Sequence, residues 1–273
     1  MKTRNAAVAG AFYPGDPKQL SSDIKNYLDK AQVEQEYENI AGIIAPHAGY
    51  IFSGPTAAYA YRAISHLQPK TVIVLSPSHR EYFRGVHIFP GDSYTTPLGS
   101  VQLDKDVIKK LIMNQEVEES SVGHNAEHAL EVQLPFLQTI FDHDFKLVPI
   151  VIGDVNLEML DSLGQSLTNL AQKEEFLIVA SSDLSHFHSY ELARKIDQEF
   201  LNLMASYDLM EIGDGFMDDT LEACGITCIY SLMKYAALKG KAKCDILDYR
   251  NSGDTAGDRD RVVGYAAGVV YQE

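Results

Sequence analysis

Two apolar stretches of the chain each lead through a proline to a histidine. His47 follows residues 40–45, and His79 follows residues 71–75. Both stretches have the length and apolar character of buried strands. Because open α/β sheets gather their ligands at the carboxyl ends of parallel strands, both imidazoles are expected in one site. Neutral imidazole nitrogen is a good ligand for iron, copper or zinc, so the spacing predicts a metal centre.

A third apolar stretch, residues 176–182, is followed by Asp183 and His186. These two side chains could supply another metal ligand. They could also form a general base with its orienting acid, on a turn after the strand. The alternative is that Asp183 has only a structural role and caps the next helix.

Cys224 lies in the sequence EACGIT, where a helix is expected to start. A helix amino terminus lowers the pKa of a thiol, and the resulting thiolate binds metals or reacts as a nucleophile. Two imidazoles with one thiolate or carboxylate leave coordination positions open, as a catalytic metal requires. The alternative is that Cys224 is a small buried apolar residue, as free cysteines often are.

His124 and His128 are four residues apart, with Glu127 beside them. This spacing could chelate a separate metal from one face of a helix, although the order is not that of the HExxH zinc proteases. A supporting role for Glu127 and His128 near the main site is the favoured interpretation.

The composition excludes several classes of function. The net charge of −15 argues against nucleic acid or an anionic membrane as a partner. No apolar run reaches the length of a membrane span, and the three cysteines are typical of a reducing compartment, so a cytoplasmic protein is expected. The sequence has no Walker A, GxGxxG or GxSxG motif, so no nucleotide cofactor is expected.

Strands and helices alternate along the chain. Strands are expected at residues 40–45, 71–75, 145–153, 176–182, 244–250 and 262–272. Helices are expected from near residue 54 to 66, from 104 to 113, from 124 to 141 with a kink at Pro135, and at 157–171, 190–207 and 225–238. Residues 86–103 suggest a short antiparallel excursion, and residues 251–261 a polar turn. This order predicts one three-layer α/β domain over residues 1–273, with a largely parallel sheet covered by helices on both faces.

Seven short blocks spread over the chain together resemble one family. The blocks are APHAGY (45–50), SPSH (76–79), TTPLG (95–99), EHALEVQLPFLQ (127–138), SSDLSH (181–186), ACG (223–225) and VGYAAG (263–268). In this order they are similar to the Memo family, whose bacterial and archaeal members are labelled AmmeMemoRadiSam system protein B. The resemblance covers nearly the whole chain.

The resemblance implies a fold similar to the class III extradiol dioxygenases of the protocatechuate 4,5-dioxygenase type. By motif, His47, His79 and Cys224 match the metal ligands, and Cys224 stands where those dioxygenases have a glutamate. His186, with Asp183 close by, matches the catalytic base. Iron or copper is the implied metal, with zinc as an alternative, because a thiolate favours softer metals.

The remaining expectations concern substrate and partners. Tyr50, Glu127 and His128 are expected to bind substrate or to support the ligands. The family label implies a link to an AMMECR1-like protein and a radical SAM protein. The leading function is a metal-dependent redox enzyme, dioxygenase-like, acting on a small molecule or peptide. The alternatives are a module that binds a metal, peptide or phosphorylated ligand without turnover, and a hydrolase with Cys224 as nucleophile and His186 as base.

Overall fold

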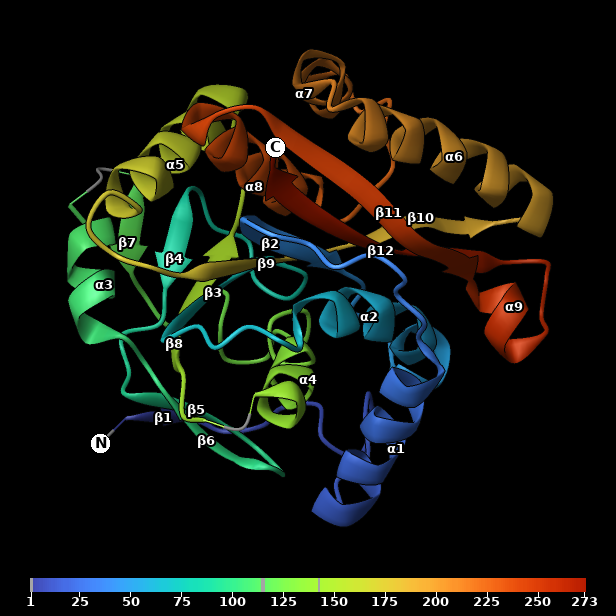
Figure 1. The fold of residues 1–273 in the computed structure, drawn as a ribbon, viewed down its shortest axis with the longest axis horizontal. Helices are drawn as coiled ribbons and strands as arrows, with labels where there is room; N and C mark the ends of the chain where they lie inside the picture. The colour runs from blue at the N-terminus through green and yellow to red at the C-terminus, as the bar shows by residue number, and fades with distance from the viewer. Residues whose placement is uncertain (1, 114–115, 142) are drawn as a thin grey trace.

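A mixed β-sheet forms the centre of the protein (Figure 1). The computed structural model describes residues 2–113, 116–141 and 143–273. Within these ranges the main sheet has nine strands in the order β10-β12-β2-β9-β3-β8-β4-β7, with β11 paired to β12. Its strands are β2 (Ile40–Ala45), β3 (Thr71–Pro77), β4 (Val86–Ile88), β7 (Val117–Glu119), β8 (Lys146–Ile152), β9 (Leu177–Ser181), β10 (Asp183–His188), β11 (Ala242–Asn251) and β12 (Val262–Gln272).

The middle of the sheet is parallel. β2, β9, β3 and β8 run in the same direction, and every residue of β3 and β9 is buried. Parallel strands covered on both faces require continuous apolar runs, which is the pattern the sequence shows here. Antiparallel pairs flank this centre, because β12 pairs with β2 on one side and β4 with β8 on the other.

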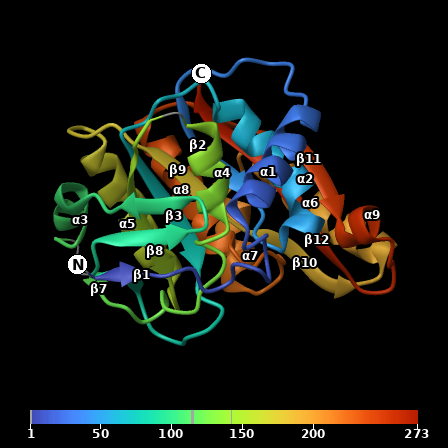
Figure 2. The ribbon, with the colours of Figure 1, turned by 90° about the horizontal axis from the view of Figure 1, so that it is seen from below.

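Helices cover both faces of the sheet and confirm the predicted three-layer α/β class. In Figure 1, α1, α2 and α4 lie below the central strands, and α5 to α8 lie above them. The view from below in Figure 2 shows α1 and α2 side by side on their face. The helices are α1 (Pro17–Lys30), α2 (Tyr50–Ile64), α3 (Lys105–Leu111), α4 (Gln133–Ile140), α5 (Leu157–Leu170), α6 (Tyr190–Ser206), α7 (Leu209–Met217), α8 (Ile226–Lys239) and α9 (Ser252–Ala256). No helix within the described ranges combines the length and apolar character needed to cross a membrane.

The predicted excursion over residues 86–103 is confirmed in part. β5 (Ser93–Thr96) and β6 (Gly99–Gln102) form an antiparallel pair, and β1 (Thr3–Arg4) joins β5 to complete a small separate sheet. β4 instead belongs to the main sheet.

The prediction of one long helix over residues 124–141 is wrong in its first half, because α4 begins only after the turns that follow His124. Pro135 lies in the first turn of α4, where a missing N–H costs no helical hydrogen bond, so it does not kink the helix. The preceding residues turn because the buried Arg4 donates hydrogen bonds to the carbonyls of His124 and Glu127.

Two further boundaries differ from the prediction. α2 begins at Tyr50 and not near residue 54, because the Tyr50 N–H finds an acceptor in the Phe12 carbonyl at 2.7 Å. Residues 251–261 are not a simple turn, since they contain α9, which begins with a capping box between Asn251 and Asp254.

α8 starts where two backbones approach closely, directly after Cys224. Gly225 is the N-cap residue, and a Cβ added there would lie 2.1 Å from the Ser181 carbonyl oxygen. A side chain at this position would therefore push the start of α8, and with it Cys224, away from the end of β9.

We expect Gly225→Ala to lower the free energy of unfolding by about 1–3 kcal/mol, the usual cost of overpacking. Urea denaturation measures this change. Gly15→Ala is the matched control, because its added Cβ has ordinary contacts of 3.6 Å, and it should change stability by less than about 0.5 kcal/mol. Equal losses in the two variants would contradict the close-approach argument.

Candidate metal centre

Three histidines meet at the carboxyl edge of the parallel strands. His47 follows β2 and His79 follows β3, while His128 comes from the turns that precede α4. One ring nitrogen from each lies within 4.8 Å of the others. The ring centroids are 5.1 Å apart for His47 and His79, 5.5 Å for His47 and His128, and 4.8 Å for His79 and His128. His47 is 2% exposed, whereas His79 is exposed, so the cluster extends from the interior to the surface.

Cys224 joins this cluster through His47. Its Sγ lies 3.1 Å from Nε2 of His47 and accepts a hydrogen bond from the Asp183 N–H at 3.3 Å. The structure thus brings together the three predicted ligands, His47, His79 and Cys224, and their binding of a metal stays a prediction. His128, which the sequence suggested as a supporting residue, contributes its own ring to the cluster.

The tautomer of His47 is determined by a buried serine. The Ser181 hydroxyl donates to the Ala129 carbonyl at 2.8 Å and accepts from the Gln133 amide at 2.7 Å. It also lies 2.8 Å from Nδ1 of His47. Since the single hydroxyl proton is used for Ala129, Nδ1 of His47 must carry a proton and donate it to Ser181. The lone pair of His47 is therefore on Nε2, which faces Cys224.

Glu127 orients His79 in the same way. Its carboxylate accepts the His79 backbone N–H at 2.5 Å and lies 3.0 Å from Nδ1 of that ring, so Nδ1 donates and Nε2 keeps its lone pair. Burial alone raises the pKa of Glu127, but the neighbouring rings of His128 and His79 outweigh it and hold the pKa well below its usual range. A carboxylate that fixes a histidine tautomer is a recurring partner of metal-binding histidines.

The His128 ring contacts the carboxylate that also orients His79. Its Nδ1 lies 3.1 Å from Oε1 of Glu127. Phe12 covers the ring, with centroids 4.5 Å apart.

The prediction that the thiol pKa of Cys224 is lowered is wrong. Burial, and then the nearby Asp183, raise the pKa of the Cys224 thiol well above its usual value. Burial, followed by His79 and His128, lowers the pKa of His47. For Cys224, the loss of hydration and the nearby Asp183 thus raise the thiol pKa by more than the amino terminus of α8 lowers it. Without a metal, the pair is neutral, with the thiol donating to Nε2 of His47.

Asp183 and His186 lie on strand β10 and not on the predicted turn. β10 forms because β12 offers it an antiparallel partner, with His186 opposite Val263. The carboxylate of Asp183 accepts the N–H groups of His47 and Ala48 at 2.7 and 3.3 Å, and so holds the turn after β2. Burial raises the pKa of Asp183.

A cavity of ≈ 430 Å³ adjoins this cluster at His128. Phe12, Ala48, Gly49, Phe52, His128, Asp183, His186, Ser252, Ala256, Asp258, Arg261, Val263 and Tyr265 line it. Tyr50 is not among these residues, because its ring packs on Tyr13 and Phe136 and its hydroxyl donates to the Val132 carbonyl at 2.6 Å. Tyr50 therefore supports the site from the core.

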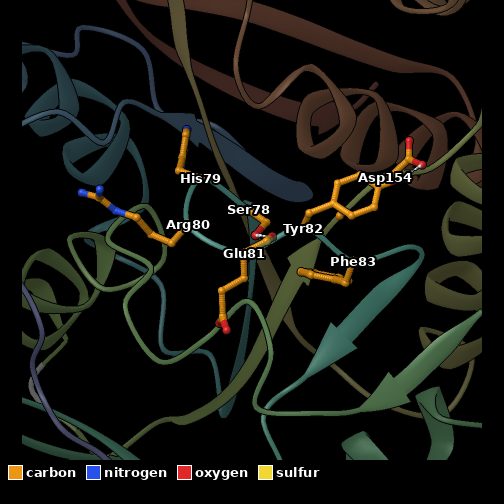
Figure 3. Close-up of a pocket in the computed structure, with 8 residues that line it drawn as sticks. Ser78, His79, Arg80, Glu81, Tyr82, Phe83 and Asp154 are labelled. Carbon is orange, nitrogen blue, oxygen red and sulfur yellow. Dashed lines mark hydrogen bonds between the residues drawn. The ribbon is translucent and has the colours of Figure 1, made fainter.

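A second, smaller hollow of ≈ 240 Å³ adjoins His79 on the other side (Figure 3). In this view the His79 ring points away from Glu81 and from Tyr82, whose hydroxyl donates to Asp154 at 2.9 Å. The loop from Ser78 to Phe83 thus presents His79 to the histidine cluster, whereas Tyr82 is exposed and Phe83 is buried against His87.

Sequence reasoning missed Ser181 and Gln133, which determine the tautomer of His47. Ser181 was assigned to the end of an apolar strand, and Gln133 to the middle of a helix. The sequence did contain one signal for Ser181, because it is a polar residue in the otherwise apolar run of β9. The second missed pair is Arg4 and Glu131, an ion pair that is almost completely buried.

Comparison with known proteins agrees with this architecture. The model of the family described as Memo-like protein matches residues 4–269. The chain belongs to the Memo family. A MEMO1 family protein of Nitrosopumilus maritimus is 36% identical over 269 residues, covering 97% of this chain and 98% of that protein. A MEMO1 family protein of Saccharolobus solfataricus is 39% identical over 283 residues, covering 97% and 98%.

The fold of the chain also resembles a solved structure of low sequence identity. An uncharacterized protein from Escherichia coli K12 superposes with a TM-score of 0.54 at 12% identity, covering 77% of this chain and 90% of that chain. At this identity the match concerns the fold alone.

The tautomer of His47 can be tested directly. In ¹⁵N NMR spectra of the metal-free protein at pH 7, His47 should be neutral and protonated at Nδ1. Ser181→Ala should redistribute the proton towards Nε2, because the acceptor is removed. Ser231→Ala, a buried serine of α8 that donates to the Thr227 carbonyl, is the control and should leave the His47 signals unchanged. A wild-type His47 protonated at Nε2 would contradict the assignment.

Proposed function

We propose that this Memo family protein binds a redox-active metal, iron or copper, and uses it to transform a small organic molecule. The observation that carries the proposal is the cluster of three histidine nitrogens within 4.8 Å, of which His128 also lines a cavity. Ligand nitrogens lie about 2 Å from a bound metal and so at most about 4 Å from each other, and one ion would draw the three rings slightly closer together.

The donor atoms fit such an ion. His47 and His79 keep their Nε2 lone pairs because Ser181 and Glu127 hold the Nδ1 protons. His128 supplies a third imidazole, and Cys224 supplies sulfur next to His47. Imidazole and thiolate together favour copper(I), iron or zinc over magnesium or calcium. A bound iron or copper ion would supply electron transfer, which amino-acid side chains lack.

His186 and Asp183 are proposed to take part in proton transfer beside the metal. Both side chains line the cavity that adjoins the cluster at His128. Asp183 holds the turn that carries His47 by accepting the N–H groups of His47 and Ala48. His186 then serves as the acid or base towards a molecule bound in the cavity.

The wider setting is also a proposal. The three cysteines are free, which suits a protein that works in a reducing cytoplasm. The family resemblance supports a functional link to an AMMECR1-like protein and a radical SAM protein, with a small molecule or peptide as the bound partner.

Metal analysis of anaerobically purified variants tests the proposed ligands. His47→Ala and His79→Ala should lose most of the bound iron or copper, because each removes a preorganised imidazole. Comparing the metal content of His128→Ala with that of Cys224→Ser shows which of these two side chains is a further ligand. His66→Ala, an exposed histidine outside the site, is the control. Full metal content in His47→Ala would refute the site.

Oxygen uptake by the metal-loaded protein, with ascorbate as electron donor, tests for turnover. His186→Ala should keep the metal but lower the rate by about 10²–10⁴, the usual contribution of a positioned acid or base. Equal metal loss in His186→Ala and His47→Ala would instead make His186 a ligand. Metal binding without any oxygen uptake would favour the non-catalytic binding module.

A further inference from the structure

Strand β10 carries two residues of the proposed site, Asp183 and His186, that are three positions apart. Both side chains line the cavity that adjoins His128. Successive side chains of a strand point to opposite faces, so residues three apart in a regular strand do not share a face. Their partners on β12, Tyr265 and Val263, are two apart and line the same cavity. β10 is therefore irregular between its two cavity residues.

The irregularity is an extra residue in β10. The pairing register shifts after Asp183, so Leu184 and Ser185 together lie opposite Gly264 of β12. Two residues opposite one form a β-bulge, which re-aims the side chains that follow it. The bulge brings His186 back to the face that Asp183 occupies. In a regular strand the two side chains would lie on opposite faces of the sheet.

A buried carboxylate on α6 holds the bulge. α6 packs on β10, β11 and β12 (Figure 1). Asp197 of this helix is fully buried, and its Oδ1 accepts the Ser185 N–H at 2.9 Å. Its Oδ2 accepts the Tyr249 hydroxyl of β11 at 2.7 Å. A bulge disrupts the hydrogen-bond ladder of a sheet locally, and here the carboxylate receives the backbone donor.

β12 leaves room for this carboxylate opposite the bulge. A Cβ added to Gly264 would lie 2.1 Å from Oδ2 of Asp197. At Gly268, farther along the same strand, an added Cβ would have ordinary contacts of 3.5 Å. The close approach therefore occurs at the glycine that faces the bulge and not at the other glycine of β12.

The bulge depends on the acceptor that Asp197 provides. Without the carboxylate, the Ser185 N–H would be unpaired in a buried position, which is costly. Regular pairing would relieve this cost by moving Ser185 to the half-buried position opposite Val263 that His186 now holds. The same change would turn the His186 side chain away from the cavity.

We propose that Asp197 is a positioning residue of the site, which holds the bulge of β10 and thereby keeps His186 on the same face as Asp183. The inference rests on the proposed function in one respect, since His186 is the acid or base of that function. The position of His186 itself can be tested in the metal-free protein.

Cross-strand NOEs show which residue lies opposite Val263. In the wild type, the Hα atom of Val263 should contact that of His186. Asp197→Ala should transfer this contact to Ser185. The Ser185 amide should also exchange with solvent at least about tenfold faster, as expected for loss of a hydrogen bond to a charged group. A Val263–His186 contact that persists in Asp197→Ala would overturn the proposal.

Two substitutions separate the acceptor from general damage to the fold. Asp197→Asn should keep the wild-type contacts, because burial raises the pKa of Asp197 and the neutral amide retains an accepting oxygen. Tyr249→Phe removes the other donor to the same carboxylate and should also leave His186 in place. A shifted register in either variant would contradict the role of the Ser185–Asp197 hydrogen bond.

Gly264→Ala tests the same bulge while keeping the carboxylate, and it decides the matter if Asp197→Ala fails to fold. Its Cβ must displace Asp197, so the register should shift as it does in Asp197→Ala. Gly268→Ala is the matched control and should retain the wild-type register. An unshifted register in folded Gly264→Ala would overturn the proposal.

Metal content and oxygen uptake separate this proposal from the proposed function. Asp183 precedes the bulge and keeps its partner Tyr265, so Asp197→Ala should bind as much metal as the wild type. Its oxygen uptake should fall about as far as that of His186→Ala. Unchanged uptake in spite of a shifted register would overturn the positioning role. A shifted register in a protein that binds neither iron nor copper would support the hold of Asp197 on β10 and refute the metal proposal alone.

Discussion

The buried ion pair between Arg4 and Glu131 is the interaction on which the site depends. Glu131 is fully buried, so its charge is tolerated only because Arg4, the Tyr13 hydroxyl and two backbone N–H groups surround it. Arg4 in turn donates to the carbonyls of His124 and Glu127. The ion pair thus fastens the amino-terminal segment to the turns that carry Glu127 and His128. It also gives Phe12 its position over His128.

The buried polar side chains at the strand ends are also held by hydrogen bonds, as Glu131 is. Ser181, Gln133, Glu127 and Asp183 each direct their hydrogen bonds at a histidine or at the backbone beside it. Because unpaired polar groups are costly in a buried site, this network permits few alternative positions of the rings. The rings are consequently preorganised before any ligand arrives, which is what an effective binding site requires.

The sequence predicted the features that depend on local pattern. The apolar runs of β2 and β3 and the prolines at their ends placed His47 and His79 at the ends of strands, where the structure has them, and the ACG block placed Cys224 next to the start of α8. Features that depend on distant partners were missed. The turns around Glu127 need Arg4, β10 needs β12, and the raised pKa of Cys224 needs the desolvation that only the complete fold produces. Neither periodicity nor spacing contains this information.

The cluster has a consequence for when the protein can acquire an ion. Cys224 and His47 touch although 177 residues separate them, and His79 and His128 come from two further segments. An unfolded chain therefore offers no ready-made group of these ligands, unlike the short-range cysteine and histidine pairs of zinc fingers. Binding of an ion here would have to follow folding, and the ion would act almost entirely on the native state. Its binding energy then adds to native stability in full by mass action, so ion supply would influence how long each molecule survives.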